Sequence, residues 1–160
     1  MADTFEIKPA TPQDTPLLLA FILELATYEK RAHEVDATEE LLHTALFGPH
    51  AHVEALVGYL NGKPVSFAIF FQNFSTYRGR SGIYVEDLFV KPEARGKGIG
   101  QNMLSHVARI AKSRHCIRME WSALDWNEDA IGFYKRLGAT AVSGTKYRIS
   151  DTALNTLANN

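Results

Sequence analysis

The chain has 160 residues, 46% of them apolar, which is enough for one compact domain with a real core. Its formal charge of -1 excludes a general attraction to nucleic acid or anionic lipid, so we expect neither as a partner. A single cysteine, Cys116, excludes an internal disulfide and favours the cytoplasm. No leader and no apolar run near the roughly 20 residues of a membrane span are visible, which predicts a soluble protein.

The first 50 residues predict one strand and two helices. Alternating apolar residues predict a strand over 5–9. Thr11 as N-cap and Pro12 at the first helical position predict a helix that reaches about Lys30. Asp36 and Glu39 have the spacing of a capping box, which predicts a second, shorter helix before the Gly-Pro break at 48–49.

The middle of the chain predicts an antiparallel meander. Two strand-like runs flank Asn61-Gly62, the strongest short hairpin signal, and a third run covers 82–90.

The remaining chain predicts a helix from Ile99, a strand within 116–124, a short helix over 127–138 and a last strand at 147–150. This order predicts an α+β (mixed α/β) fold with one domain over 1–160.

The stretch "VEDLFVKPEARGKGIG" ends a strand at Val90 and leads through a glycine-rich turn into a helix. Such a turn gathers backbone N–H groups at the positive end of a helix, which suits a phosphate. Glycines at 96, 98 and 100 leave room for a ligand, and Arg95 and Lys97 add positive charge for a diphosphate. The other interpretation is a turn that is merely tight. The common G-x-G-x-x-G nucleotide motif fails at Gln101.

The segment "RGKGIG" resembles the R/Q-x-x-G-x-G/A motif of the GCN5-related N-acetyltransferases (GNAT), which bind the pyrophosphate of acetyl-coenzyme A. "YVEDLFVKPEARGKGIG" and "LDWNEDAIGFYKRLGA" are similar to the diamine acetyltransferase branch, which includes spermidine/spermine and thialysine acetyltransferases. With "FEIKPAT" and "ELATYEK", the resemblance covers nearly the whole chain.

The resemblance implies a GNAT fold, with a central mixed, mostly antiparallel twisted sheet of six to seven strands flanked by about four helices. It implies an acetyl-CoA-dependent N-acetyltransferase that transfers acetyl directly to a primary amine of a small substrate, either a polyamine or a thialysine/lysine-like amine. It also implies a homodimer. The other hypotheses are an acceptor that is a protein lysine or an amine-bearing antibiotic, and a non-catalytic acyl-CoA sensor.

An alkylammonium is almost fully protonated at neutral pH, so the reaction needs a base. The resemblance assigns that role, and contact with the substrate, to Glu86. Strand alternation places Asp87 on the opposite face unless a bulge intervenes, and the alternative is that both acids lie on a solvated face. Tyr134 corresponds to the family's general acid, although a tyrosine at this spacing also packs a helix onto a sheet.

The resemblance further implies contacts with substrate and cofactor. Asn127 either caps its helix or contacts the pantetheine arm. Tyr28 and Glu29 correspond to substrate-contacting positions, or to an exposed helix end. The backbone that runs beside the pantetheine and the loop at the pyrophosphate comprise Leu88, Phe89, Val90, Arg95, Gly96, Lys97, Gly98, Ile99 and Gly100.

Two further features of the sequence bear on the substrate and on metal binding. "STYRGRSG" replaces the acidic loop of polyamine enzymes, so Arg78 and Arg80 either bind a substrate carboxylate or lie in an exposed hairpin turn. The six histidines show no H-E-x-x-H and no ligand spacing with cysteine, so no metal is expected.

Overall fold

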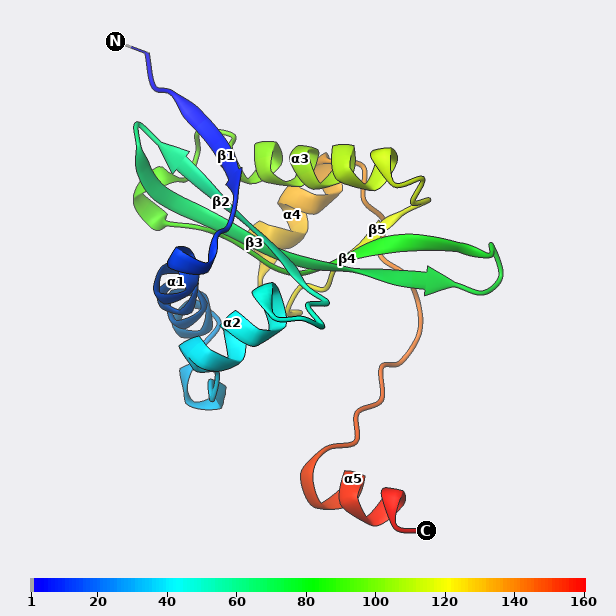
Figure 1. Cartoon of the computed structure of the whole chain (residues 1–160). Coiled ribbons are helices and arrows are strands. Elements are labelled where there is room, and N and C mark those ends of the chain that lie inside the picture. Colours follow the sequence, from blue (N-terminus) through cyan, green and yellow to red (C-terminus); the bar gives the residue numbers. More distant parts are fainter. Residues whose placement is uncertain (1) are drawn as a thin grey trace. The chain divides into compact units, whose positions relative to one another are not determined.

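The computed structural model describes residues 2–160 and divides into two compact units after Asp125 (Figure 1). The first unit holds the whole sheet and three helices, and the second, Trp126–Asn160, holds two helices.

The sheet of the described residues has five strands in the order β1-β2-β3-β4-β5. The first four pair antiparallel in sequence, with β2 to β4 forming the predicted meander, and β5 pairs parallel with β4. The mixed, mostly antiparallel sheet is therefore confirmed, but the predicted six to seven strands are too many. The strands are β1 Phe5–Pro9, β2 Glu54–Leu60, β3 Lys63–Ser75, β4 Arg80–Val90 and β5 Met119–Glu120.

Five α-helices are described, one more than expected, because a helix follows residue 150 near the C-terminus. Short 3-10 turns cover 12–14, 32–34 and 92–94. The helices are α1 Thr15–Tyr28, α2 Glu39–Phe47, α3 Ile99–Ser113, α4 Glu128–Arg136 and α5 Asp151–Ala158.

The starts of the first two helices differ from the prediction. The Thr11-Pro12 signal begins a 3-10 turn, in which the carboxylate of Asp14 accepts the Thr11 N–H at 2.8 Å, and α1 follows directly. The cap of α2 is Thr38, whose hydroxyl oxygen accepts the Leu41 N–H at 3.1 Å. The capping box predicted from Asp36 is therefore wrong, because that residue lies two positions before the true cap.

Helices α1 and α2 lie on one side of the sheet and α3 lies on the other (Figure 1). On the first side, the Phe21 ring stacks on Phe67 with centroids 5.2 Å apart, and Phe89 meets both rings edge-on at 6.5 Å. This cluster is the centre of the core that α1 shares with β3 and β4. Its buried members are Leu18, Phe21, Leu46, Ala55, Val57, Phe67, Ile69 and Phe89.

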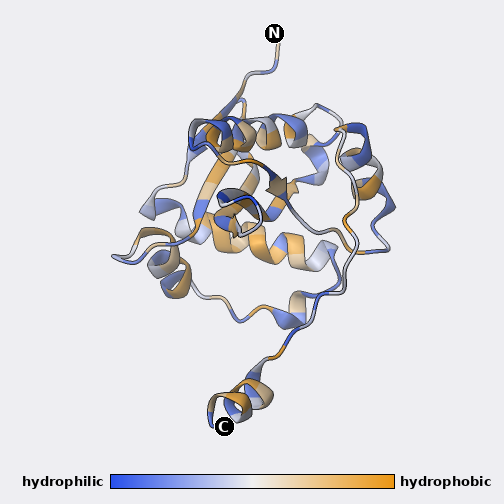
Figure 2. Cartoon of the chain, turned by 90° about the vertical axis from the view of Figure 1, so that its right-hand side faces the viewer, coloured by the Kyte–Doolittle hydropathy of each residue, from blue (hydrophilic) through white to orange (hydrophobic). Residues whose placement is uncertain are grey.

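Helix α3 covers the opposite side with one apolar face. Alternating hydrophobic and hydrophilic bands on the helices show the same one-sided pattern (Figure 2). The helix thereby fixes the direction in which its first turn, at the predicted phosphate loop, leaves the sheet. The buried residues of α3 are Ile99, Met103, Leu104, Val107 and Ala111.

Two predicted strands are shorter than expected or missing. The strand predicted within 116–124 pairs only at Met119 and Glu120, opposite Ile83 and Tyr84. A bulge at Glu86 bends β4 just beyond this point, which ends the parallel ladder. The strand predicted at 147–150 is wrong, because no described strand pairs with these residues, and the chain enters α5 instead.

No described helix is both long and apolar enough to cross a bilayer. Within residues 2–160, no three His, Cys, Asp or Glu side chains gather in a way that would hold a metal ion.

Candidate active site

The predicted base lies at a β-bulge in β4. Ile69 pairs with Asp87 and Phe70 with Val85, so Glu86 is the extra residue without a partner on β3. Because the bulge changes the phase of the strand, Asp87 faces the side of the sheet that carries Ile69 and α1. The side chain of Glu86 is exposed. Strand alternation in the sequence placed Asp87 on the face opposite Glu86 unless a bulge intervened, and the structure contains that bulge.

Asp87 is the carboxyl group that its surroundings perturb most strongly. Burial, together with the negative charges of Glu86 and Glu29, raises its pKa from the ordinary 3.8 to about 7. Burial also raises the pKa of Glu29. Three carboxyl groups from two elements thus form one acidic cluster, which favours a bound cation.

The end of α1 holds Glu29 in this cluster. The helix closes in a Schellman turn, with Lys30 N–H donating to Thr27 O at 3.1 Å and Arg31 N–H to Ala26 O at 2.8 Å. Lys30 adopts a left-handed φ of 61° to make the turn. Tyr28 and Glu29 are therefore placed by a defined helix end rather than by a loose loop.

The predicted phosphate loop has the backbone that its glycines require. Gly96 and Gly98 have φ of 79° and 75°, in the left-handed region, and no atom lies within 4 Å of a Cβ built at either position. Gly98 is the N-cap of α3, so the first N–H groups of the helix point out at this loop. Open space and free donors fit the diphosphate of a coenzyme.

Arg95 connects the glycine loop to Tyr28, one of the predicted substrate-contacting residues. Its Nε donates to the carbonyl of Val90 at 2.9 Å, and its guanidinium lies 4.9 Å from the centroid of Tyr28 and 5.6 Å from that of Phe89. Two residues that the sequence assigned to separate roles, cofactor and substrate, therefore touch each other. Lys97, the other loop cation, pairs with Asp3 at 2.6 Å.

The outer edge of β4 is available beside the acids. Parallel pairing with β5 ends at Tyr84 and Glu120, and no described strand pairs with β4 beyond that point on this side. The backbone of Leu88 to Val90, predicted to run beside the pantetheine, belongs to this edge. Such an edge offers peptide donors and acceptors in a row to an extended ligand.

The second unit contains the remaining two candidates, both on α4. Asn127 caps the helix, because its side-chain oxygen accepts the Ala130 N–H at 3.3 Å. The capping role is confirmed, and the cofactor contact stays a prediction. Tyr134 lies seven residues further, with its ring 5.4 Å from that of Phe133.

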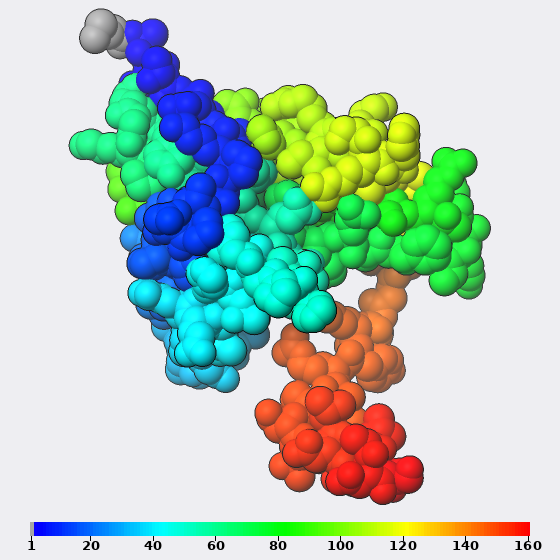
Figure 3. Space-filling view, in the orientation of Figure 1, coloured from blue at the N-terminus to red at the C-terminus, as the bar shows by residue number. Residues whose placement is uncertain are grey.

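Arg78 and Arg80 lie at the tip of the β3–β4 hairpin, which projects from the surface of the first unit (Figure 3). Both are exposed. Arg80 precedes Glu86 by six strand residues, a separation of about 20 Å. The hairpin-turn interpretation is confirmed, and neither arginine side chain spans that distance to Glu86 of the same chain.

Sequence reasoning missed three features of the site. The high pKa of Asp87 depends on the bulge in β4 and on the nearby charge of Glu29. The alternation of residues along the strand predicted neither of them. The Arg95–Tyr28 and Lys97–Asp3 contacts join segments far apart in the chain. No short stretch of the sequence indicates that these distant segments meet. An open hollow of about 440 Å³ between the starts of α1 and α2 contains none of the predicted residues.

Comparisons with known proteins agree with this geometry. The model of the acetyltransferase (GNAT) family matches residues 19–139. A cattle thialysine N-epsilon-acetyltransferase is 37% identical over 141 residues, covering 83% of this chain and 82% of the relative. An Arabidopsis L-ornithine N5-acetyltransferase is 27% identical and covers 83% of this chain and 78% of its own length.

Among solved structures, an integron cassette protein of Vibrio cholerae superposes with a TM-score of 0.81 at 32% identity, over 98% of both chains. The glycine loop at the start of α3, the bulged acidic strand and the family match over most of the chain agree with one another. The chain belongs to the acetyltransferase (GNAT) family, whose members use acetyl-CoA as co-substrate, and it is an N-acetyltransferase.

Proposed function

We propose that the protein transfers acetyl from acetyl-CoA directly to the side-chain amine of a small amino acid of the lysine, thialysine or ornithine type. The observation that carries this proposal is the acidic cluster of Glu29, Glu86 and Asp87, placed where the free edge of β4 runs into the glycine loop. The names of two relatives, one a thialysine and one an ornithine acetyltransferase, support the substrate class.

The cluster suits the amine end of such a substrate. An ammonium bound beside Asp87 stabilises its carboxylate and lowers the pKa that burial and neighbouring acids had raised. Binding of the cation is therefore linked to release of a proton from the protein. The exposed hairpin arginines are too far along β4 to hold the carboxylate of the same molecule, so we propose no role for Arg78 and Arg80 in one chain's site.

Proton transfer is divided between two groups. Glu86, exposed at the bulge, takes the proton from the substrate ammonium, and the resulting free amine forms a bond to the acetyl carbonyl carbon. The C–S bond then breaks, and the hydroxyl of Tyr134 gives its proton to the departing thiolate. The second proton that the attacking nitrogen loses restores the phenol, and Glu86 releases its own proton to solvent. A thiol pKa near 8.5 lies below the phenol's 10, so the donor must lie close to the sulfur as the charge develops.

The donor's binding residues follow from the loop and the strand edge. Acetyl-CoA supplies the thioester and the thiol leaving group. The N–H groups at Gly96, Gly98, Ile99 and Gly100 would hold its diphosphate, and the edge from Leu88 to Val90 would hold the pantetheine arm, joined by Asn127. A backbone N–H of that edge would polarise the thioester carbonyl.

The function is tested by thiol release from acetyl-CoA with a panel of acceptors. The panel holds thialysine, lysine, ornithine, spermidine, putrescine, an aminoglycoside and a lysine peptide. We expect the highest kcat/KM with the three amino acids. A preference for the peptide or the aminoglycoside would reject the substrate class, and binding of acetyl-CoA without turnover of any amine would leave an acyl-CoA sensor.

Tyr134→Phe tests the acid role. We expect kcat to fall by about 100-fold or more, with Kd for acetyl-CoA nearly unchanged, because the ring stays and only the proton donor is lost. Tyr147→Phe, the same change elsewhere in the second unit, is the control. Unchanged turnover of Tyr134→Phe across pH 6 to 9 contradicts the assignment.

We also propose that the chain acts in the cytoplasm as a single acetyltransferase domain, without a metal, and assembles as a homodimer. The lone cysteine and the balanced charge support the location. The family resemblance supports the assembly.

A further inference from the structure

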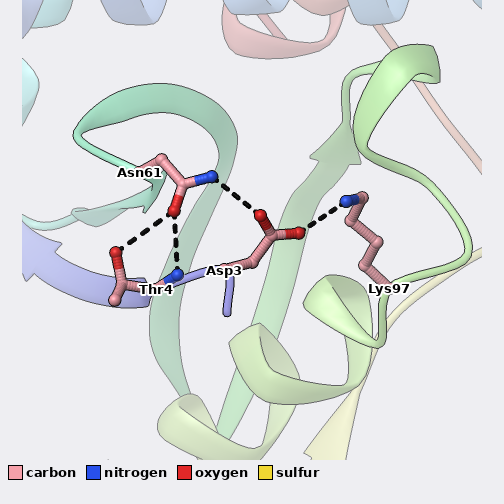
Figure 4. A network of polar contacts seen from close by, with 4 residues as sticks. All are labelled: Asp3, Thr4, Asn61 and Lys97. Carbon is pink, nitrogen blue, oxygen red and sulfur yellow. Dashed lines mark hydrogen bonds and ion pairs between the residues drawn. The ribbon is translucent and has the colours of Figure 1, made fainter. Parts of the chain in front are cut away.

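The cation in the middle of the cofactor loop is neutralised by a residue from the start of the chain. Lys97 Nζ donates to Asp3 Oδ2 at 2.6 Å (Figure 4). Lys97 stands between the two left-handed glycines of the loop, and Asp3 lies two residues before β1. The N-terminal segment thus supplies a carboxylate to the loop that would bind the donor's diphosphate.

This carboxylate is held in place by a third segment. Asn61 Nδ2 donates to Asp3 Oδ1 at 2.9 Å, and Asn61 Oδ1 accepts the Thr4 N–H at 2.9 Å and its hydroxyl at 3.3 Å. Asn61 and Gly62 form the β2–β3 turn with φ of 51° and 79°. Figure 4 shows the turn, the N-terminal segment and the loop meeting at Asp3. A fixed anion therefore faces the loop cation.

The pair is close but accessible to solvent. The side chains of Lys97 and Asp3 are 45% and 47% exposed. Exposed pairs are weak and screened by salt, so another anion of higher charge can replace the carboxylate at small cost. The lysine ammonium is a point charge on a flexible stem and does not need a fixed geometry to change partners.

We propose that Asp3 is a stand-in anion for the diphosphate of acetyl-CoA: it occupies Lys97 in the free protein and is displaced when the donor binds. The inference rests on the proposed function and adds a residue outside the family motif that sets donor affinity. Asp3 acts through Lys97, so it is a positioning residue that lowers affinity for the donor. Donor binding in turn frees the N-terminal segment from the loop.

The test is titration of the whole protein with CoA by calorimetry at low salt. Asp3→Asn keeps the shape of the side chain and removes its charge, so we expect Kd for CoA to fall about two- to fivefold, the range for an exposed ion pair. In a Lys97→Gln background the same change has no effect, because the competed cation is gone. Asp36→Asn, which removes an equal charge from an exposed site elsewhere, leaves Kd unchanged.

A second variant and a second donor sharpen the result. Asn61→Gly keeps the positive φ of the turn but removes the amide that holds Asp3, so it tightens CoA binding in the same direction. S-acetylpantetheine lacks the diphosphate, so Asp3→Asn leaves its KM unchanged while lowering that of acetyl-CoA. High salt reduces the difference between Asp3→Asn and the unmodified protein.

Weaker or unchanged CoA binding by Asp3→Asn overturns the inference, as does an effect that persists without Lys97. If the unmodified protein binds CoA and acetylates amines while Asp3→Asn changes nothing, only this inference fails. If the unmodified protein does not bind CoA, the proposed function and the inference fail together.

Discussion

Asp87 shows how one residue can depend on contacts that its neighbours in sequence do not reveal. The pair Glu86-Asp87 reads in sequence as one functional acid and one structural acid. In the structure, Glu86 is the exposed bulge residue, and Asp87 has its pKa raised to about 7 by burial and by Glu86 and Glu29. The sequence did not reveal which of the two carboxyl groups is perturbed, because the burial of Asp87 depends on α1.

The raised pKa gives a stability prediction with a definite sign. The folded state binds the Asp87 proton more tightly than the unfolded state, so this group's contribution is fully present below about pH 4 and is lost as pH rises to about 7. Asp87→Asn removes that loss. We expect the free energy of unfolding at pH 9 to rise by about 2–4 kcal/mol, with little change at pH 4.

Urea unfolding at pH 4, 7 and 9 measures this difference, with Asp36→Asn as a control for loss of one charge. Equal effects of Asp87→Asn at pH 4 and pH 9 would show that the carboxyl is not perturbed. Because Asp87 lies in the proposed substrate cluster, the stabilised variant should also have a higher KM for the amine.

At the level of elements, the helices and long strands followed from local signals, and the ends often did not. The Asn61-Gly62 turn and the apolar spacing of α3 are properties of short segments, and both were predicted correctly. β5 was predicted far too long, because its length depends on where β4 bends. The strand predicted at 147–150 failed for a related reason: alternation shows where a strand can form, and only a neighbour makes it one.

The two candidate caps of α2, Thr38 in the structure and Asp36 from the sequence, predict different effects of mutation. Thr38→Ala removes the hydroxyl that accepts the Leu41 N–H, so we expect the free energy of unfolding to fall by about 1 kcal/mol. Asp36→Ala should cost almost nothing. Urea denaturation of both variants decides the point, and a larger loss for Asp36→Ala would restore the capping box predicted from the sequence.

At the scale of the whole molecule, the family and the fold class were predictable because motif and element order are properties of the chain. The places of β1 and β5 at the two edges of the sheet and the contact of Asp3 with Lys97 were not, since they depend on which distant segments meet. The acids and the glycine loop were named from sequence. Their connection through Arg95 and Tyr28 required the structure.

The proposed assembly is also a property of the whole molecule. The chain has a mass of 17.8 kDa, and we expect sedimentation velocity at micromolar concentration to give twice that value. A single species at the monomer mass that still acetylates amines would reject the homodimer while leaving the catalytic proposal in place.

The bulge at Glu86 has a consequence for how β4 tolerates change. Before the bulge, Ile83 and Val85 face α3, and after it Asp87 and Phe89 face α1, so one strand contributes to both cores in two different phases. A substitution at position 86 changes only a side chain. Deleting that position would place Val85 next to Asp87, opposite Phe70 and Ile69, so the ladder would become regular and both side chains would keep their faces. The extra residue therefore adds an exposed carboxylate to a largely buried strand without changing which side chains the two cores receive.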